Sequence, residues 1–199
     1  MLTATLTSPE ATGRFARLFA ARLTPPALVT LRGELGTGKT TLVRDVLHAL
    51  GVEGVVASPS FTLAQSYEGA ASLRLHHLDL YRLGRGADVT LFAWEDYLDG
   101  SSLTFVEWPE AGAAELPPAD VDVALTHRTP DSRGLALRAG PDLEAALAAE
   151  MAAAGIDDVL LAPGASASDE VTAGTGAAPR AGRADTPAGR EARSPQAAT

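Results

Sequence analysis

The sequence predicts an α/β fold in which helices flank a mixed, largely parallel sheet, followed by a C-terminal antiparallel hairpin and helix. A β-branched run at residues 27–31 passes through a glycine-rich turn into residues with helical apolar spacing, as in a strand–loop–helix unit. A second apolar run, at residues 103–106, is nearly continuous, which is typical of strands buried in a parallel sheet. Residues 121–128 and 134–139 are β-like runs separated by turn-forming residues, and they predict the hairpin.

The composition limits the classes of protein to which the chain can belong. With 199 residues, of which 46 % are hydrophobic, it can bury the core of one domain. It has no cysteine, which excludes disulfides, zinc–thiolate sites and thiol catalysis and favours an intracellular compartment. No targeting segment or membrane-spanning stretch is visible, so we expect a cytoplasmic protein with no membrane contact. The net charge of -9 argues against a broad nucleic-acid-binding surface.

The first predicted helix ends near Leu23. Ser8 suits its N-cap and Pro9 its first helical position, and the apolar residues Phe15 and Phe19 lie on one face. The simplest interpretation of this apolar face is that it packs in the core. Residues 24–26 end the helix before the first central strand.

The segment GELGTGKT at residues 33–40 matches the phosphate-binding pattern G-x-x-x-x-G-K-[ST] between a strand and a helix, so the fold is expected to be P-loop NTPase-like. Lys39 should place its ammonium on the β and γ phosphates, and the Thr40 hydroxyl should help coordinate Mg²⁺. Lys39 is the only lysine among 16 Lys and Arg residues, which suggests a task that a guanidinium cannot perform. The residues expected to bind the nucleotide are Gly33, Glu34, Leu35, Gly36, Thr37, Gly38, Lys39, Thr40 and Thr41.

A loop at residues 55–69 leads into the next predicted strand. It carries several hydroxyl groups, among them those of Ser60 and Thr62, and Pro59 disfavours helix before it. In a P-loop protein such a segment can act as a switch that senses the γ phosphate or the metal. An ordinary turn and edge strand is the alternative.

Residues 72–83 alternate as a strand and end in charged residues. Asp79 at the end of a strand beside a P-loop can hold a water of the metal or orient a nucleophile. Arg82, shortly after it, is the best cation within the chain for neutralising charge in the transition state. A metal pair of His76 and His77 is not expected, because neighbours on a strand point to opposite faces.

A short helix is predicted at residues 89–100, before the apolar strand 103–106 that delivers Glu107 at its end. An acid in this place can contact the metal or activate the attacking water, so Glu107 is a candidate metal residue together with Thr40. The candidate catalytic residues are Glu107, Asp79 and Lys39. Trp108 follows directly. It can close over the site, face a partner or fill the core.

The C-terminal part changes in character at about residue 163. Residues 141–154 predict an alanine-rich helix that begins with proline and ends before Gly155. Residues 163–199 are rich in Ala, Gly, Ser, Thr and Pro and have no apolar period, so we expect a disordered tail behind a P-loop ATPase domain of residues 1–162.

The motifs GELGTGKTTL, SPSFTL, HHLDLYRL and FVEWPE follow one another in this order. With them the chain resembles the TsaE (formerly YjeE) family, the ATPase component of bacterial tRNA threonylcarbamoyladenosine biosynthesis. The resemblance implies binding of ATP and Mg²⁺, slow hydrolysis by the isolated subunit, docking onto a TsaB–TsaD pair, and contact with tRNA only through those partners. By motif position it makes Lys39 and Thr40 phosphate and metal residues, Asp79 and Glu107 functional acids, and Trp108 an aromatic residue near the site.

Two positions depart from the family pattern, and two other functions stay open. Ser60 stands where the family usually has threonine, and Glu34 where aspartate is common. A small-molecule kinase would use the same P-loop but would need an arginine cluster around a second pocket, which is not evident between residues 53 and 128. An ATP-binding module without turnover is the other alternative. A GTP switch is disfavoured, because an N-K-x-D motif would need a second lysine.

Overall fold

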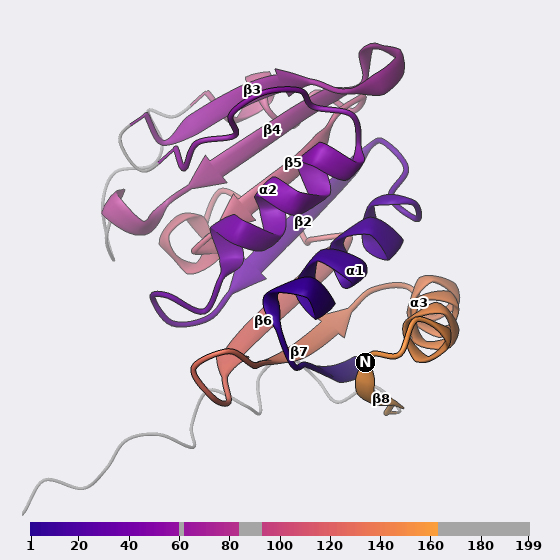
Figure 1. Ribbon diagram of the computed structural model, residues 1–199. Coiled ribbons are helices and arrows are strands. Elements are labelled where there is room, and N and C mark those ends of the chain that lie inside the picture. The colour runs from indigo at the N-terminus through magenta and orange to yellow at the C-terminus, as the bar shows by residue number, and fades with distance from the viewer. Residues whose placement is uncertain (60–61, 84–92, 163–199) are drawn as a thin grey trace, which may run out of the picture. The chain divides into compact units, whose positions relative to one another are not determined.

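Eight strands form one sheet in the part of the chain described by the computed structural model, which comprises residues 1–59, 62–83 and 93–162. The strand order is β3-β4-β5-β2-β6-β7-β1-β8 (Figure 1). The strands are β1 (Leu2–Leu6), β2 (Ala27–Arg32), β3 (Ala64–Glu68), β4 (Arg74–Asp79), β5 (Leu103–Glu107), β6 (Val121–His127), β7 (Arg133–Arg138) and β8 (Asp157–Leu161). The helices are α1 (Pro9–Ala20), α2 (Lys39–Ala49) and α3 (Pro141–Ala153), with short 3₁₀ turns η1 (Ala70–Ser72), η2 (Tyr81–Leu83), η4 (Trp94–Asp96) and η5 (Pro109–Gly112).

The centre of the sheet is parallel and its two sides are antiparallel. Strands β4, β5, β2 and β6 run in parallel, whereas β3, β7, β1 and β8 pair antiparallel with their neighbours. The predicted mixed α/β fold with a C-terminal hairpin and helix is therefore confirmed. Because parallel strands end at the same edge, the loop after β2 and the ends of β4 and β5 meet there.

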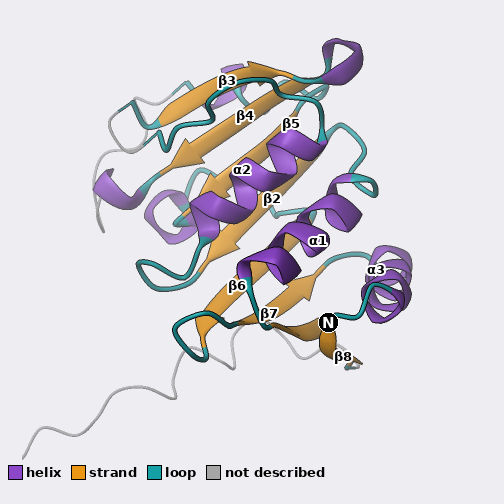
Figure 2. Cartoon of the chain, viewed as in Figure 1, coloured by secondary structure: helices purple, strands orange, loops and turns teal. Residues whose placement is uncertain are grey.

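Both long N-terminal helices cover one face of the sheet (Figure 2). Phe15 and Phe19 of α1 stack with ring centroids 5.5 Å apart, and both are buried together with Leu42 and Leu47 of α2. The opposite face carries a smaller cluster, formed by Leu28, Leu78, Leu80 and Val106 with the partly buried Trp94 and Tyr97. Among the described residues, no helix combines the length and apolar character that a membrane span requires.

The two outer strands β1 and β8 are not predicted from the sequence. β8 pairs only with β1 within the described residues, and Leu160 and Leu161 remain 64 % and 50 % exposed. A strand that is half exposed and paired on one side shows no clear apolar alternation, because packing constrains few of its side chains. Strand β1 is short and directly precedes a helix cap, so its five residues give little periodic signal.

The helix predicted at residues 89–100 is wrong for the portion that the structure describes. Residues 89–92 lie outside the described residues, and after them only the single 3₁₀ turn η4 forms. The carbonyl of Tyr97 accepts hydrogen bonds from the hydroxyls of Ser102 and Thr104, so the chain turns back along β5. The tail predicted at residues 163–199 also lies outside the described residues, so its disorder stays a prediction.

Candidate nucleotide and metal site

The glycine-rich loop joins β2 to α2 at the carboxyl edge of the parallel strands. Gly33 has φ of +133°, and a Cβ atom there would lie 2.2 Å from the carbonyl oxygen of Leu125. Gly38 is the N-cap of α2 with φ of +98°. Side chains would be strained at both positions, so glycine is required for this path. The loop places the N-terminal end of α2, with its positive partial charge, at the carboxyl edge of the parallel strands.

The ammonium of Lys39 is folded back against its own loop. Its Nζ atom donates to the carbonyl oxygens of Gly33, at 2.7 Å, and Glu34, at 3.0 Å. The same atom lies 3.8 Å from the ring centroid of Trp108. Lys39 is only 4 % exposed, and burial lowers its pKa although the carboxylates of Glu107, Asp79 and Glu110 act in the opposite direction. The loop therefore holds a desolvated cation whose direct hydrogen-bond partners are neutral carbonyls.

Thr40 and Glu107 are in contact, as neighbouring metal residues would be. The hydroxyl of Thr40 donates to Oε2 of Glu107 at 3.0 Å, and the imidazole Nε2 of His77 lies 2.8 Å from Oε1. Glu107 is 2 % exposed and His77 is fully buried. Both carboxylate oxygens of Glu107 are thus held in place, one by the P-loop helix and one by β4.

Asp79 lies beside Glu107, because β4 and β5 pair with these two residues in register. Its Oδ1 accepts the backbone N–H of Tyr81 at 3.1 Å, and its Oδ2 lies 3.4 Å from the hydroxyl of Ser58. Asp79 therefore connects the end of β4 to the loop that was predicted as a switch.

The donor set of this edge fits Mg²⁺ bound together with a nucleotide. A hydroxyl from Thr40 and carboxylates from Glu107 and Asp79 are oxygen ligands, which Mg²⁺ prefers. Over the described residues there is no group of three or more His, Cys, Asp or Glu side chains that could hold a metal by itself.

The other predicted site residues are spread around this edge. Ser60 lies outside the described residues, and Thr62 is exposed with its N–H bonded to the carbonyl of Pro59. Arg82 is exposed in η2. Trp108 is half-buried with a left-handed φ of +58°, and its ring lies 4.9 Å from that of Tyr81. Leu35 is 70 % exposed, and Thr41 is exposed on the first turn of α2.

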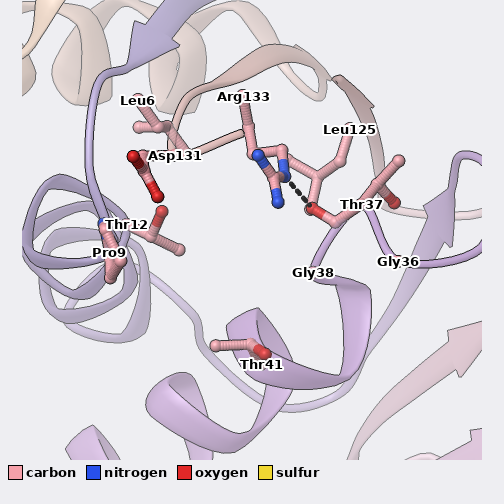
Figure 3. A pocket seen from close by; sticks show the side chains of 10 residues that line it. All are labelled: Leu6, Pro9, Thr12, Gly36, Thr37, Gly38, Thr41, Leu125, Asp131 and Arg133. Carbon is pink, nitrogen blue, oxygen red and sulfur yellow. Dashed lines mark hydrogen bonds between the residues drawn. The ribbon is translucent and has the colours of Figure 1, made fainter. Parts of the chain in front are cut away.

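A pocket of about 200 Å³ adjoins the loop on the side of α1 (Figure 3). Arg133 points into it, and its Nε donates to the carbonyl of Thr37 at 3.0 Å. The Nη1 atom of the same side chain donates to the carbonyls of Thr129 and Pro130 in the β6–β7 turn. The lining residues are Leu6, Pro9, Thr12, Gly36, Thr37, Gly38, Thr41, Leu125, Asp131 and Arg133.

Sequence reasoning missed His77 and Arg133. His77 shares a strand face with Asp79, two residues later, and this spacing was the available signal. Arg133 gives no such signal, because its contact with the loop joins residues 96 positions apart.

The chain is similar to proteins of one known family in both sequence and fold. Residues 6–135 match the family described as Threonylcarbamoyl adenosine biosynthesis protein TsaE. The chain is 37 % identical over 131 residues to the tRNA threonylcarbamoyladenosine biosynthesis protein TsaE of Haemophilus influenzae, covering 65 % of this chain and 82 % of that protein. It is 32 % identical over 133 residues to the Bacillus subtilis protein of the same description, covering 66 % and 82 %. The crystal structure of Bacillus subtilis YdiB superposes with a TM-score of 0.61 at 27 % identity, covering 77 % of this chain and 96 % of YdiB.

Proposed function

We propose that this chain, which belongs to the TsaE family of tRNA threonylcarbamoyladenosine biosynthesis proteins, is the subunit that binds and hydrolyses ATP in that pathway. In the proposal it uses Mg²⁺ as cofactor and acts on a TsaB–TsaD partner complex. It contacts tRNA only through those partners and works in the cytoplasm, without membrane contact.

The contact between Thr40 and Glu107 is the observation that carries the proposal. A hydroxyl at the start of the P-loop helix and a carboxylate at the end of a neighbouring parallel strand lie 3.0 Å apart. This pairing of oxygen ligands suits a Mg²⁺ ion bound to the β and γ phosphates. When bound, the ion would neutralise charge on the phosphates, and Glu107 and Thr40 would hold it.

Lys39 would change partners when the nucleotide binds. In the structure its ammonium donates hydrogen bonds to two carbonyl oxygens of the loop. Phosphate oxygens would replace these carbonyls as stronger, charged acceptors. The loop N–H groups and the N-terminus of α2 would bind the same phosphates. The pocket that contains Arg133 is also lined by Gly36, Gly38 and Thr41 of the phosphate-binding segment. In the proposal this pocket therefore receives the nucleoside.

Asp79 would orient the attacking water or a water of the metal. Its bond to Ser58 supports a role for the following loop, with Ser60 and Thr62, in sensing the nucleotide. The ammonium of Lys39 is close enough to Glu107 and Asp79 for their charges to act on its pKa, and the exposed Arg82 lies in η2, shortly after the end of β4. In the proposal, rapid turnover requires a docked partner that brings Thr62 and Arg82 to the nucleotide, so hydrolysis by the isolated chain should be slow.

Steady-state ATPase measurements on the chain alone and with TsaB and TsaD test this function. We expect slow turnover that the partners accelerate. Glu107→Gln should stay folded and bind ATP, yet lose most of the partner-stimulated rate, by about 10²-fold or more. Fast turnover without partners would favour a self-sufficient ATPase or a small-molecule kinase, whereas no hydrolysis with partners present would favour an ATP-binding module.

A further inference from the structure

The imidazole of His77 bonds to a carboxylate oxygen of Glu107 from the sheet side of the site. Its Nε2 lies 2.8 Å from Oε1 of Glu107, and the two side chains are 0 % and 2 % exposed. Thr40 occupies the other oxygen, Oε2. The strand register explains the contact, because His77 and Asp79 lie on the same face of β4 and Asp79 pairs with Glu107.

Only one tautomer of His77 fits these contacts. A carboxylate accepts hydrogen bonds, so the proton of the neutral ring must be on Nε2. The other ring nitrogen, Nδ1, is buried and has no hydrogen-bond partner among the described residues. No group there competes for the ring, so the bond to Glu107 is the polar contact that fixes its orientation.

We propose that His77 is a positioning residue that holds Oε1 of Glu107 and thereby presents Oε2 to the metal ion and to Thr40. The proposal rests on the proposed function, since it assigns Glu107 to the Mg²⁺-nucleotide site. A carboxylate on a freely rotating side chain would lose conformational entropy when it engages the ion. The His77 bond removes that freedom in advance, as partners behind a metal ligand do in other proteins.

A set of substitutions at position 77 separates positioning from packing. His77→Leu fills the space but removes the donor. In His77→Gln the amide nitrogen can take the place of Nε2, whereas in His77→Asn it reaches only as far as Nδ1. His76→Leu is the matched control, because His76 is a buried histidine on the same strand whose bond goes to Ser66 instead.

The main readout is the gain in ATP affinity that Mg²⁺ produces, measured by calorimetry of the full chain with Mg²⁺ and with EDTA. We expect His77→Leu and His77→Asn to bind ATP in EDTA within about threefold of the wild type and to lose about tenfold or more of the Mg²⁺-dependent gain. His77→Gln should retain the gain within about threefold, and His76→Leu should retain it fully. If His77→Leu does not fold, the comparison of Gln with Asn decides the matter.

Histidine ring NMR on the free protein provides a readout that needs no nucleotide. The proposal expects a hydrogen on Nε2 of His77, and a neutral ring with its proton on Nδ1 alone would overturn it. An unchanged Mg²⁺-dependent gain in the folded Leu and Asn variants would also overturn it, as would a loss in the Gln variant equal to theirs. If instead the wild type binds no ATP, the proposed function fails, while the NMR result still decides how His77 bonds to Glu107.

Discussion

Replacing Lys39 by methionine should separate the cost of burying its ammonium from its use in binding a nucleotide. In the free protein the side chain is 4 % exposed, and its ammonium bonds to two carbonyl oxygens and lies against the ring of Trp108. Burial lowers the pKa of this lysine, so the folded state disfavours the charged form. Methionine keeps the length of the side chain and removes the charge.

The effect on stability follows from opposing contributions of similar size. Two hydrogen bonds from a charged donor are lost at about 1.5–3 kcal/mol each, and the contact with Trp108 adds up to about 2 kcal/mol. Against this stands the desolvation of a buried ammonium, which costs several kcal/mol. Because these opposing contributions are of similar size, we expect the free energy of unfolding of Lys39→Met to stay within about 1 kcal/mol of the wild type or to rise.

ATP binding should respond in the opposite direction. Phosphate oxygens would replace the two carbonyl acceptors, so the affinity gains from the stronger bonds to charged acceptors and from the attraction to the phosphate charge. We expect Lys39→Met to lose at least about 100-fold in affinity, which corresponds to about 3 kcal/mol. Urea unfolding and calorimetry with Mg-ATP measure the two quantities on the same samples. Arg44→Met is the control, because Arg44 is an exposed cation on the same helix, 3.8 Å from its neighbour Asp45.

Two results would refute this reasoning. A loss of more than about 2 kcal/mol in stability for Lys39→Met would mean that the loop needs the ammonium as a structural tie. Unchanged ATP affinity would show that Lys39 does not bind the nucleotide, and it would contradict the assignment of the P-loop to the proposed site.

Three further predictions concern the pocket, a buried histidine and the tail. Arg133→Met should lower ATP affinity about tenfold with little change in fold, because the carbonyl of Thr37 loses its tie; equal affinities in calorimetry would contradict this. Burial lowers the pKa of His76, so the unfolded chain binds its proton more readily and stability should fall as pH drops below about 6.5. His76→Gln should flatten this slope in urea unfolding, and an identical pH profile would show that other groups cause it. We propose that residues 1–162 are the ATPase domain, so deleting residues 163–199 should leave the melting temperature and partner stimulation unchanged; a fall in either would show that the tail contributes.

The strand-end acids could be predicted because they follow from local sequence. Glu107 ends a continuous apolar run and Asp79 ends an alternating one, and parallel strands bring such ends to one edge. The partners of these acids could not be predicted in the same way. The bond from His77 to Glu107 depends on β4 and β5 being neighbours in a particular register, which no local pattern specifies. Strand β8 could not be predicted for a related reason, because it is defined by its pairing with β1 and not by a local apolar pattern.

The hydrogen bonds between the β6–β7 hairpin and the glycine-rich loop have a consequence for folding during synthesis on the ribosome. Arg133 bonds to Thr37 across 96 residues, and His127 contacts the carbonyl of Leu35 across 92 residues. At a synthesis rate of about 5–20 residues per second, the ribosome completes the hairpin about 5–20 s after the loop. During that interval the loop lacks these ties, so we expect nucleotide to stabilise the N-terminal half of a nascent chain less than it stabilises the complete fold. The full stabilising effect of cellular ATP should therefore appear only once the hairpin has emerged and docked.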